Sequence, residues 1–214
     1  MKRNYFLMAA LLIAATLIVT LALYPYLPDR IPTHWNWRGE IDRYGEKWEI
    51  FLLPGVMVLF VLFYAALPWL SPRRFDVGAF RSTYLYIMLL LIVFFAYLQA
   101  LILWAAFSKP LDMNRSLMTA ACLLLILLGN VLGRVRRNFY IGVRTPWTLA
   151  SEKVWDATHR FAARAFVLAG LLGLLSMAVS SGAAAALVIL GAALLASALY
   201  SLAYYKRLER RNEL

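Results

Sequence analysis

Two stretches of the sequence combine imidazole and carboxylate groups, the side chains that most often bind metal ions or transfer protons. The first stretch, residues 25–49, contains His34, Glu40, Asp42 and Glu46. These groups could hold a metal ion or a cationic ligand, but their spacing matches no metal-binding motif. A hydrogen-bonded hairpin with solvated charges is therefore favoured, and we predict no metal and no other cofactor.

The second stretch, residues 138–160, is a polar and aromatic run between two long apolar segments. Its last part is expected to be a helix in which four residues share one face: Glu152, Trp155, Asp156 and His159. Asp156 and His159 could bind a metal or act as acid and base, or the face could bind a cytoplasmic partner through Trp155. In a third interpretation the helix lies on the membrane surface, where Asp156 pairs with Arg160 and His159 faces water or a phosphate. We favour this third interpretation, because no nucleophile or further strong ligand stands nearby.

The composition decides which environment surrounds these stretches. Of 214 residues, 63% are apolar and 15% are charged, which is too apolar for a water-soluble domain. The formal net charge is +11. Lysine and arginine beside apolar spans set membrane topology and contact anionic lipid, so we expect membrane lipid as a partner and no direct binding of nucleic acid.

Six apolar segments are long enough to cross a bilayer, and all should be helices because lipid offers no partner to unpaired backbone groups. They cover residues 5–24, 50–70, 83–107, 116–133, 161–180 and 184–204. The first is longer than the apolar core of a signal peptide, so it is expected to remain as an anchor. Pro54 and Pro68 predict a bend or a late start in the second segment.

The distribution of basic residues predicts the orientation. With the amino terminus inside, the cytoplasmic segments hold sixteen lysines and arginines and the external segments hold six. The positive-inside rule then places both termini in the cytoplasm. We therefore predict an all-α membrane protein of the bacterial plasma membrane, with six spans, a small external hairpin loop and a cytoplasmic interfacial helix.

Local patterns predict two further features. Pro25, Pro28 and Pro32 exclude a helix at the start of the external loop, and a two-residue period over residues 33–38 followed by Gly39 predicts a short hairpin. Small residues recur every four positions on the last two spans: Ala165, Ala169 and Gly173 on one, and Ala193, Ser197 and Ser201 on the other. We expect these spans to pack closely, joined by a turn at residues 180–182.

A family resemblance follows from both loops. The run NFYIGVRTPWTLASEKVWDATHR, preceded by Gly129-Asn130, resembles the signature region of the SdpI family of bacterial membrane immunity proteins. The first loop, LPDRIPTHWNWRGEIDRYG, is similar to an N-terminal domain of unknown function found in longer members. We therefore expect an N-terminal region at residues 1–80 and an SdpI-like region at residues 81–214.

The resemblance implies protection from a secreted, membrane-active peptide toxin, and sequestration of a cytoplasmic repressor when toxin is present. By this resemblance the toxin-facing candidates are His34, Trp35, Trp37, Glu40 and Asp42. The candidates for the cytoplasmic partner are Arg144, Trp147, Glu152, Trp155, Asp156, His159 and Arg160.

The sequence also bears on two other classes of function. An enzyme is disfavoured, because the two histidines are predicted on opposite sides of the bilayer and no convergent catalytic set is visible. A small-molecule transporter is the alternative, since three spans in each half would give inverted repeats. The predicted spans contain Gln99 and Asn130 but no carboxylate, which argues against coupling of transport to protons.

Overall fold

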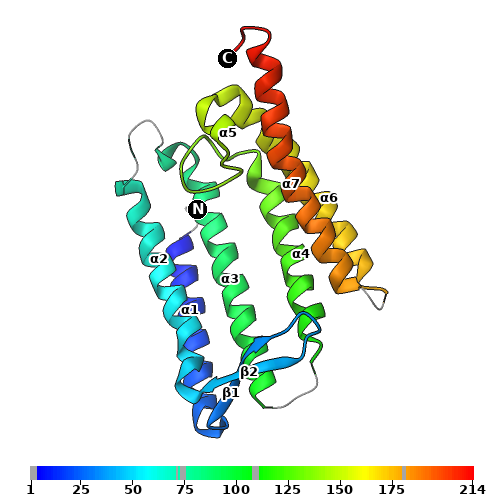
Figure 1. Ribbon diagram of the computed structural model, residues 1–214. Coiled ribbons are helices and arrows are strands. Elements are labelled where there is room, and N and C mark those ends of the chain that lie inside the picture. The colour runs from blue at the N-terminus through cyan, green and yellow to red at the C-terminus, as the bar shows by residue number, and fades with distance from the viewer. Residues whose placement is uncertain (1–3, 71, 73–75, 108–110, 180–181) are drawn as a thin grey trace. The chain divides into compact units, whose positions relative to one another are not determined.

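A computed structural model describes residues 4–70, 72, 76–107, 111–179 and 182–214 of the chain (Figure 1). Its elements are α1 (Tyr5–Leu23), η1 (Tyr24–Tyr26), β1 (Arg30–Trp35), β2 (Ile41–Glu46), η2 (Lys47–Phe51), α2 (Leu52–Leu70), η4 (Val77–Phe80), α3 (Arg81–Ala106), α4 (Met113–Leu132), α5 (Pro146–Ala150), α6 (Glu152–Ser176) and α7 (Gly182–Glu209). Among the described residues, six helical segments are long and apolar enough to cross a membrane, which confirms the predicted number of spans.

The boundaries of two predicted elements differ from the observed ones. The helix expected on the membrane surface is not separate, because it is the first part of α6, which continues without a break to Ser176. The second span begins as the 3-10 turn η2, and Pro54 then falls in the first turn of α2, where few backbone amides have a helical partner. Residues 180–181 of the predicted turn, and the basic residues Lys2, Arg3, Arg73, Arg74 and Lys109, lie outside the described residues.

The chain forms two compact units, and the first comprises residues 1–66 and 85–120. In this unit β1 and β2 form an antiparallel hairpin, with Arg30 opposite Glu46 and an irregular register between Pro32 and Trp35. The base of the hairpin is buried against the end of α3 in a cluster of Leu27, Ile31, Ile50, Leu103 and Ala106. The hairpin therefore stands on a fixed apolar base.

Gln99 is the polar centre of the first unit. Its side chain is buried, and its amide nitrogen donates to Thr20 Oγ1 at 3.2 Å and to the carbonyl of Ile50 at 2.9 Å. A buried hydrogen bond between apolar helices fixes their register. Gln99 therefore joins α1, η2 and α3.

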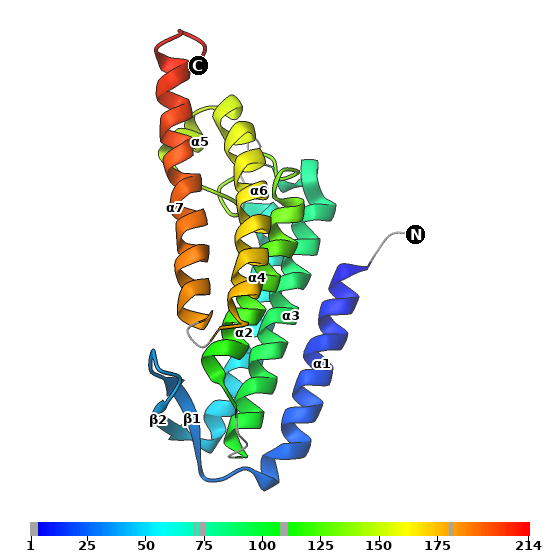
Figure 2. The ribbon, with the colours of Figure 1, turned by 90° about the vertical axis from the view of Figure 1, so that its right-hand side faces the viewer.

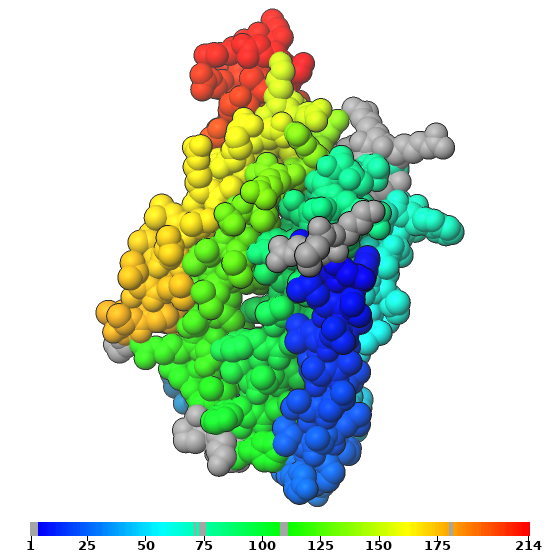
Figure 3. All heavy atoms as spheres, turned by 180° about the vertical axis from the view of Figure 1, so that it is seen from behind, coloured from blue at the N-terminus to red at the C-terminus, as the bar shows by residue number. Residues whose placement is uncertain are grey.

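The second unit comprises residues 67–84 and 121–214, and it contains the pair α6 and α7 (Figure 2). On α7 the side chains of Ala193, Ser197 and Ser201 are buried, as their spacing predicts. Helix α6 also lies against α4, beside which it is seen in the space-filling view from behind (Figure 3). A Cβ at Gly170 would lie 2.7 Å from the carbonyl oxygen of Cys122, so this contact requires a glycine.

Candidate functional site

The tip of the hairpin is held by Asn36. Its side-chain oxygen accepts hydrogen bonds from the backbone amides of Arg38 (2.8 Å) and Glu40 (3.1 Å). Its side-chain nitrogen donates to the carboxylate of Glu40 at 2.8 Å. Gly39 has a φ of +82°, in the left-handed region that favours glycine. The tip is further fixed by Asn114 at the start of α4, which donates to the carbonyl of Trp37 at 2.8 Å.

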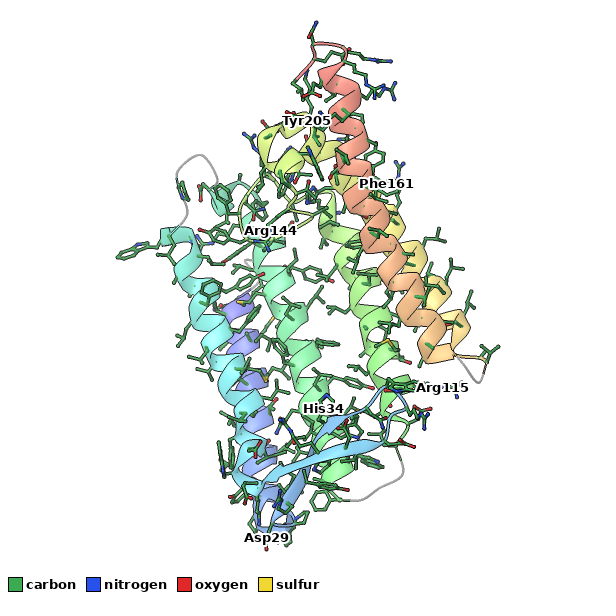
Figure 4. All side chains as sticks on the ribbon, viewed as in Figure 1. Asp29, His34, Arg115, Arg144, Phe161 and Tyr205 are labelled. Atoms are coloured by element: carbon green, nitrogen blue, oxygen red, sulfur yellow. The ribbon has the colours of Figure 1, made fainter. Side chains whose placement is uncertain are left out.

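The toxin-facing candidates divide into separate groups. His34, which is labelled in Figure 4, has its Nδ1 2.6 Å from the carboxylate of Asp42, and both side chains are exposed. Glu40 does not join them, because it binds Asn36. Trp35 is half-buried, whereas Trp37 is 81% exposed and has the guanidinium of Arg38 4.8 Å from its ring centre.

The described part of the chain contains no group of three or more histidine, cysteine, aspartate or glutamate side chains placed to hold a metal ion. What the hairpin presents instead is exposed aromatic surface. Besides Trp37, the side chains of Tyr26, Tyr44 and Trp48 are exposed. Tyr26 precedes the alternating pattern of residues 33–38, so the sequence did not point to it.

The second stretch folds around Asn138, which is fully buried. Its side-chain oxygen accepts from the amides of Tyr140 (2.7 Å) and Ile141 (2.8 Å). Its side-chain nitrogen donates to the carbonyls of Arg136 (2.7 Å) and Ile141 (3.1 Å). All four of these hydrogen bonds join the Asn138 side chain to backbone groups of the loop. Asn138 therefore determines the shape of the loop.

His159 closes the loop from α6. Its Nε2 accepts a hydrogen bond from the amide of Val143 at 3.1 Å, and its Nδ1 donates to the carbonyl of Trp155 at 2.8 Å. Because one ring nitrogen accepts and the other donates, the imidazole is neutral in this arrangement. Gly142 has a φ of +114°, and a Cβ there would lie 2.2 Å from His159 Nε2. The backbone can approach the ring only because residue 142 is glycine.

The short helix α5 is built by a Thr-Pro-x-Thr sequence. Thr145 and Thr148 form a capping box, and Pro146 occupies the first helical position. The hydroxyl of Thr148, which is buried, also donates to the carbonyl of Val143 at 2.8 Å. Thr145 Oγ1 lies 2.9 Å from Ser201 Oγ on α7, which ties the loop to the last helix. The sequence contains this capping pattern, but α5 was not among the predicted helices.

Trp155 is fully buried, and its indole nitrogen donates to the carbonyl of Val135 at 2.8 Å. Its ring stacks on the imidazole of His159 with 4.0 Å between the ring centres. The prediction that Trp155 anchors a partner on an exposed face is therefore wrong, as is the prediction that His159 faces water or a phosphate. Both rings point inward because the loop folds back over this face of α6.

The other candidates for partner binding remain at the surface. Arg144, Glu152 and Arg160 are exposed, Trp147 and Asp156 are half-buried, and Arg144 donates to the carbonyl of Phe139 (Figure 4). The carboxylate of Asp156 faces the guanidinium of Arg136 at 3.9 Å and not that of Arg160, which corrects the predicted ion pair. The structure thus separates this set into a buried, loop-shaping pair and a charged surface.

Two regions of the chain match described families. Residues 134–205 match the SdpI/YfhL protein family, and residues 11–58 match a domain of unknown function, DUF1648. The chain is also similar to the immunity protein SdpI of Bacillus subtilis (strain 168), with 29% identity over 210 residues that make up 97% of this chain and 98% of that protein. No solved structure matches the chain. Together with the six long apolar helices, these similarities make the chain a multi-pass membrane protein.

Proposed function

We propose that the chain is an integral-membrane immunity protein, which protects the cell that makes it from a secreted, membrane-active peptide toxin, because residues 134–205 match the SdpI/YfhL family and nearly the whole chain is similar to an immunity protein. The observation that carries this proposal is the extent of the similarity to an immunity protein. That similarity covers 97% of the chain and therefore includes both the hairpin and the loop before α6.

We propose that the hairpin is external and that the toxin meets it there. The hairpin connects the first and second spans, and the excess of basic residues in the alternate segments favours an outside position for it. It offers a fixed backbone on which Trp37 and Tyr44 are exposed, and Trp48 is exposed on η2 directly after it. Exposed aromatic rings on a rigid support bind apolar peptide surface at a small cost in side-chain entropy.

The test is survival of a toxin-sensitive bacterium that expresses the chain, with its membrane potential recorded during exposure to a sporulation-delay-type peptide. Retained potential is expected with the wild-type chain. Trp37→Ala should lose most of the protection, whereas Trp69→Ala should keep it, because Trp69 is 94% exposed but lies at the end of α2 and not on the hairpin. Collapse of the potential while the wild-type chain is present in the membrane would refute immunity, and uptake by vesicles would then test the transport alternative.

The signalling role implied for the family needs a surface for a cytoplasmic repressor. In this chain we propose the exposed residues beside the loop, Arg144, Glu152 and Arg160, and we exclude Trp155 because it is buried. Reversing the charge of Arg144 should leave resistance intact and abolish the response of a repressor-controlled reporter. An unchanged response would remove this surface from consideration.

A further inference from the structure

A cavity of about 550 Å³ opens on the second unit, and neither Trp155 nor His159 is among the residues that line it. Three segments line it: η4 with the first turn of α3, the residues that follow α4, and the first turns of α6. Its charged and hydroxyl side chains include Arg81, Ser82, Arg134, Arg136, Asp156 and Arg160. We call this cavity the arginine pocket.

The charges of the arginine pocket do not balance. Four arginines are among the residues that line it, against one acidic residue, Asp156. That carboxylate lies 3.9 Å from Arg136, and among the described residues no carboxylate lies within 4.0 Å of the guanidinium groups of Arg81, Arg134 or Arg160. Like charges gathered in one cavity repel each other, so an anion bound among them would lower the energy of the folded chain.

The pocket also lies at a defined level along the helices that form it. The apolar part of α3 begins just after Arg81, α4 ends at Leu132 just before Arg134, and the apolar part of α6 begins just after Arg160. The pocket therefore occupies the boundary between the apolar and polar parts of this unit. In a bilayer this boundary is where the phosphate groups of lipids lie.

From the charge and the position of the arginine pocket we propose that it binds a phosphate group, supplied by the headgroup of an anionic phospholipid. The planar guanidinium group donates two parallel hydrogen bonds to phosphate oxygens, which makes arginine the usual residue for this ligand. The hydroxyl of Ser82 is a further donor in the same cavity. This site uses neither the hairpin nor the toxin, so it is independent of the proposed immunity function, and it shares only Arg160 with the proposed repressor surface.

The test uses the purified full-length chain in a neutral detergent and measures the binding of phosphatidylglycerol by native mass spectrometry. The double variant Arg134→Gln/Arg160→Gln should bind the lipid roughly thirtyfold more weakly, at about fivefold for each arginine near a phosphate. The matched control is Arg207→Gln/Arg210→Gln, which removes the same charge from exposed positions at the end of α7. Equal weakening in both double variants would overturn the proposal, because it would show a general effect of net charge.

A second variant guards against simple misfolding. Asp156→Asn removes the only carboxylate of the arginine pocket and frees Arg136, so it should strengthen lipid binding by about fivefold. A misfolded protein would not bind more tightly. Unchanged or weaker binding by this variant would contradict the proposal.

Inorganic phosphate distinguishes the two sources of the ligand. If millimolar inorganic phosphate leaves phosphatidylglycerol bound, the headgroup is the ligand. If it displaces the lipid from the wild-type chain but does not bind the Arg134→Gln/Arg160→Gln variant, the phosphate site stands and free phosphate is the ligand. If inorganic phosphate and lipid both bind the pocket variant as tightly as the wild-type chain, there is no such site.

Discussion

At the scale of single residues, the polar side chains of the loop before α6 act on backbone and not on a ligand. Asn138, Thr148 and His159 are all buried, and their hydrogen bonds end on amides and carbonyls of the loop or of α6. Leaving such a backbone group without a partner costs about 1–3 kcal/mol. Substitutions at these positions are therefore expected to change stability first.

Gly142→Ala is the sharpest test of this arrangement. The new Cβ would lie 2.2 Å from His159 Nε2 at a backbone φ of +114°, so both the ring and the Val143–His159 hydrogen bond must be displaced. We expect a loss of about 3 kcal/mol in the free energy of unfolding. Denaturant unfolding of the detergent-solubilised protein measures it.

The control for this substitution is Gly191→Ala in α7, where a Cβ meets no atom within 4 Å and the backbone is helical. Alanine favours a helix over glycine by up to about 1 kcal/mol, so this variant should be as stable as the wild-type chain or slightly more so. Equal loss in the two variants would show that the close approach to His159 contributes nothing.

The sequence predicted which residues of this region share a helical face but not which way that face points. The period of α6 places Trp155 and His159 together whatever surrounds them. Their burial depends on the loop from Gly133 to Ser151 folding back over α6, which is a tertiary contact. The indole nitrogen of Trp155 donates to the carbonyl of Val135, twenty residues earlier, and no local sequence pattern predicts this hydrogen bond.

At the scale of elements, the long helices and the hairpin could be predicted because each follows from a local requirement. Backbone in lipid must be helical, so hydropathy alone finds the spans. The two-residue period over residues 33–38 and the glycine that follows Arg38 predict the hairpin. The short elements α5, η2 and η4 were not predicted, because single turns depend on caps such as Thr145 and Asp76 more than on periodicity.

The packing of α4 against α6 makes a prediction at this scale. A Cβ at Gly170 already meets Ile126 at 2.5 Å and the carbonyl of Cys122 at 2.7 Å, so Gly170→Val must push the two helices apart. We expect a loss of about 1–3 kcal/mol in unfolding free energy. Gly191→Val, which adds the same side chain at an open position of α7, should cost less than about 1 kcal/mol. A similar cost for both variants would mean that α4 and α6 are not closely packed.

At the scale of the whole molecule, six crossings would put the hairpin and the loop before α6 on opposite sides of a membrane. The hairpin follows the first span and the loop follows the fourth, so an odd number of crossings separates them. Which of them lies outside is predicted from the basic residues, sixteen of which fall in the segments that include the loop. The proposed toxin surface and the proposed repressor surface both depend on this orientation.

Single cysteines test the orientation in intact cells. Cys122 is fully buried, so the native chain should not react with a membrane-impermeant maleimide and needs no prior substitution. Arg38→Cys, at the exposed tip of the hairpin, should be labelled from outside, whereas Glu152→Cys and Arg210→Cys should be labelled only after the cells are permeabilised. Arg38→Cys lowers the number of external basic residues from six to five. The substitution therefore keeps the excess of basic residues in the predicted cytoplasmic segments and should not change the orientation that the labelling measures. Labelling of Glu152→Cys and not of Arg38→Cys in intact cells would invert the topology and place the hairpin in the cytoplasm, out of reach of a secreted toxin.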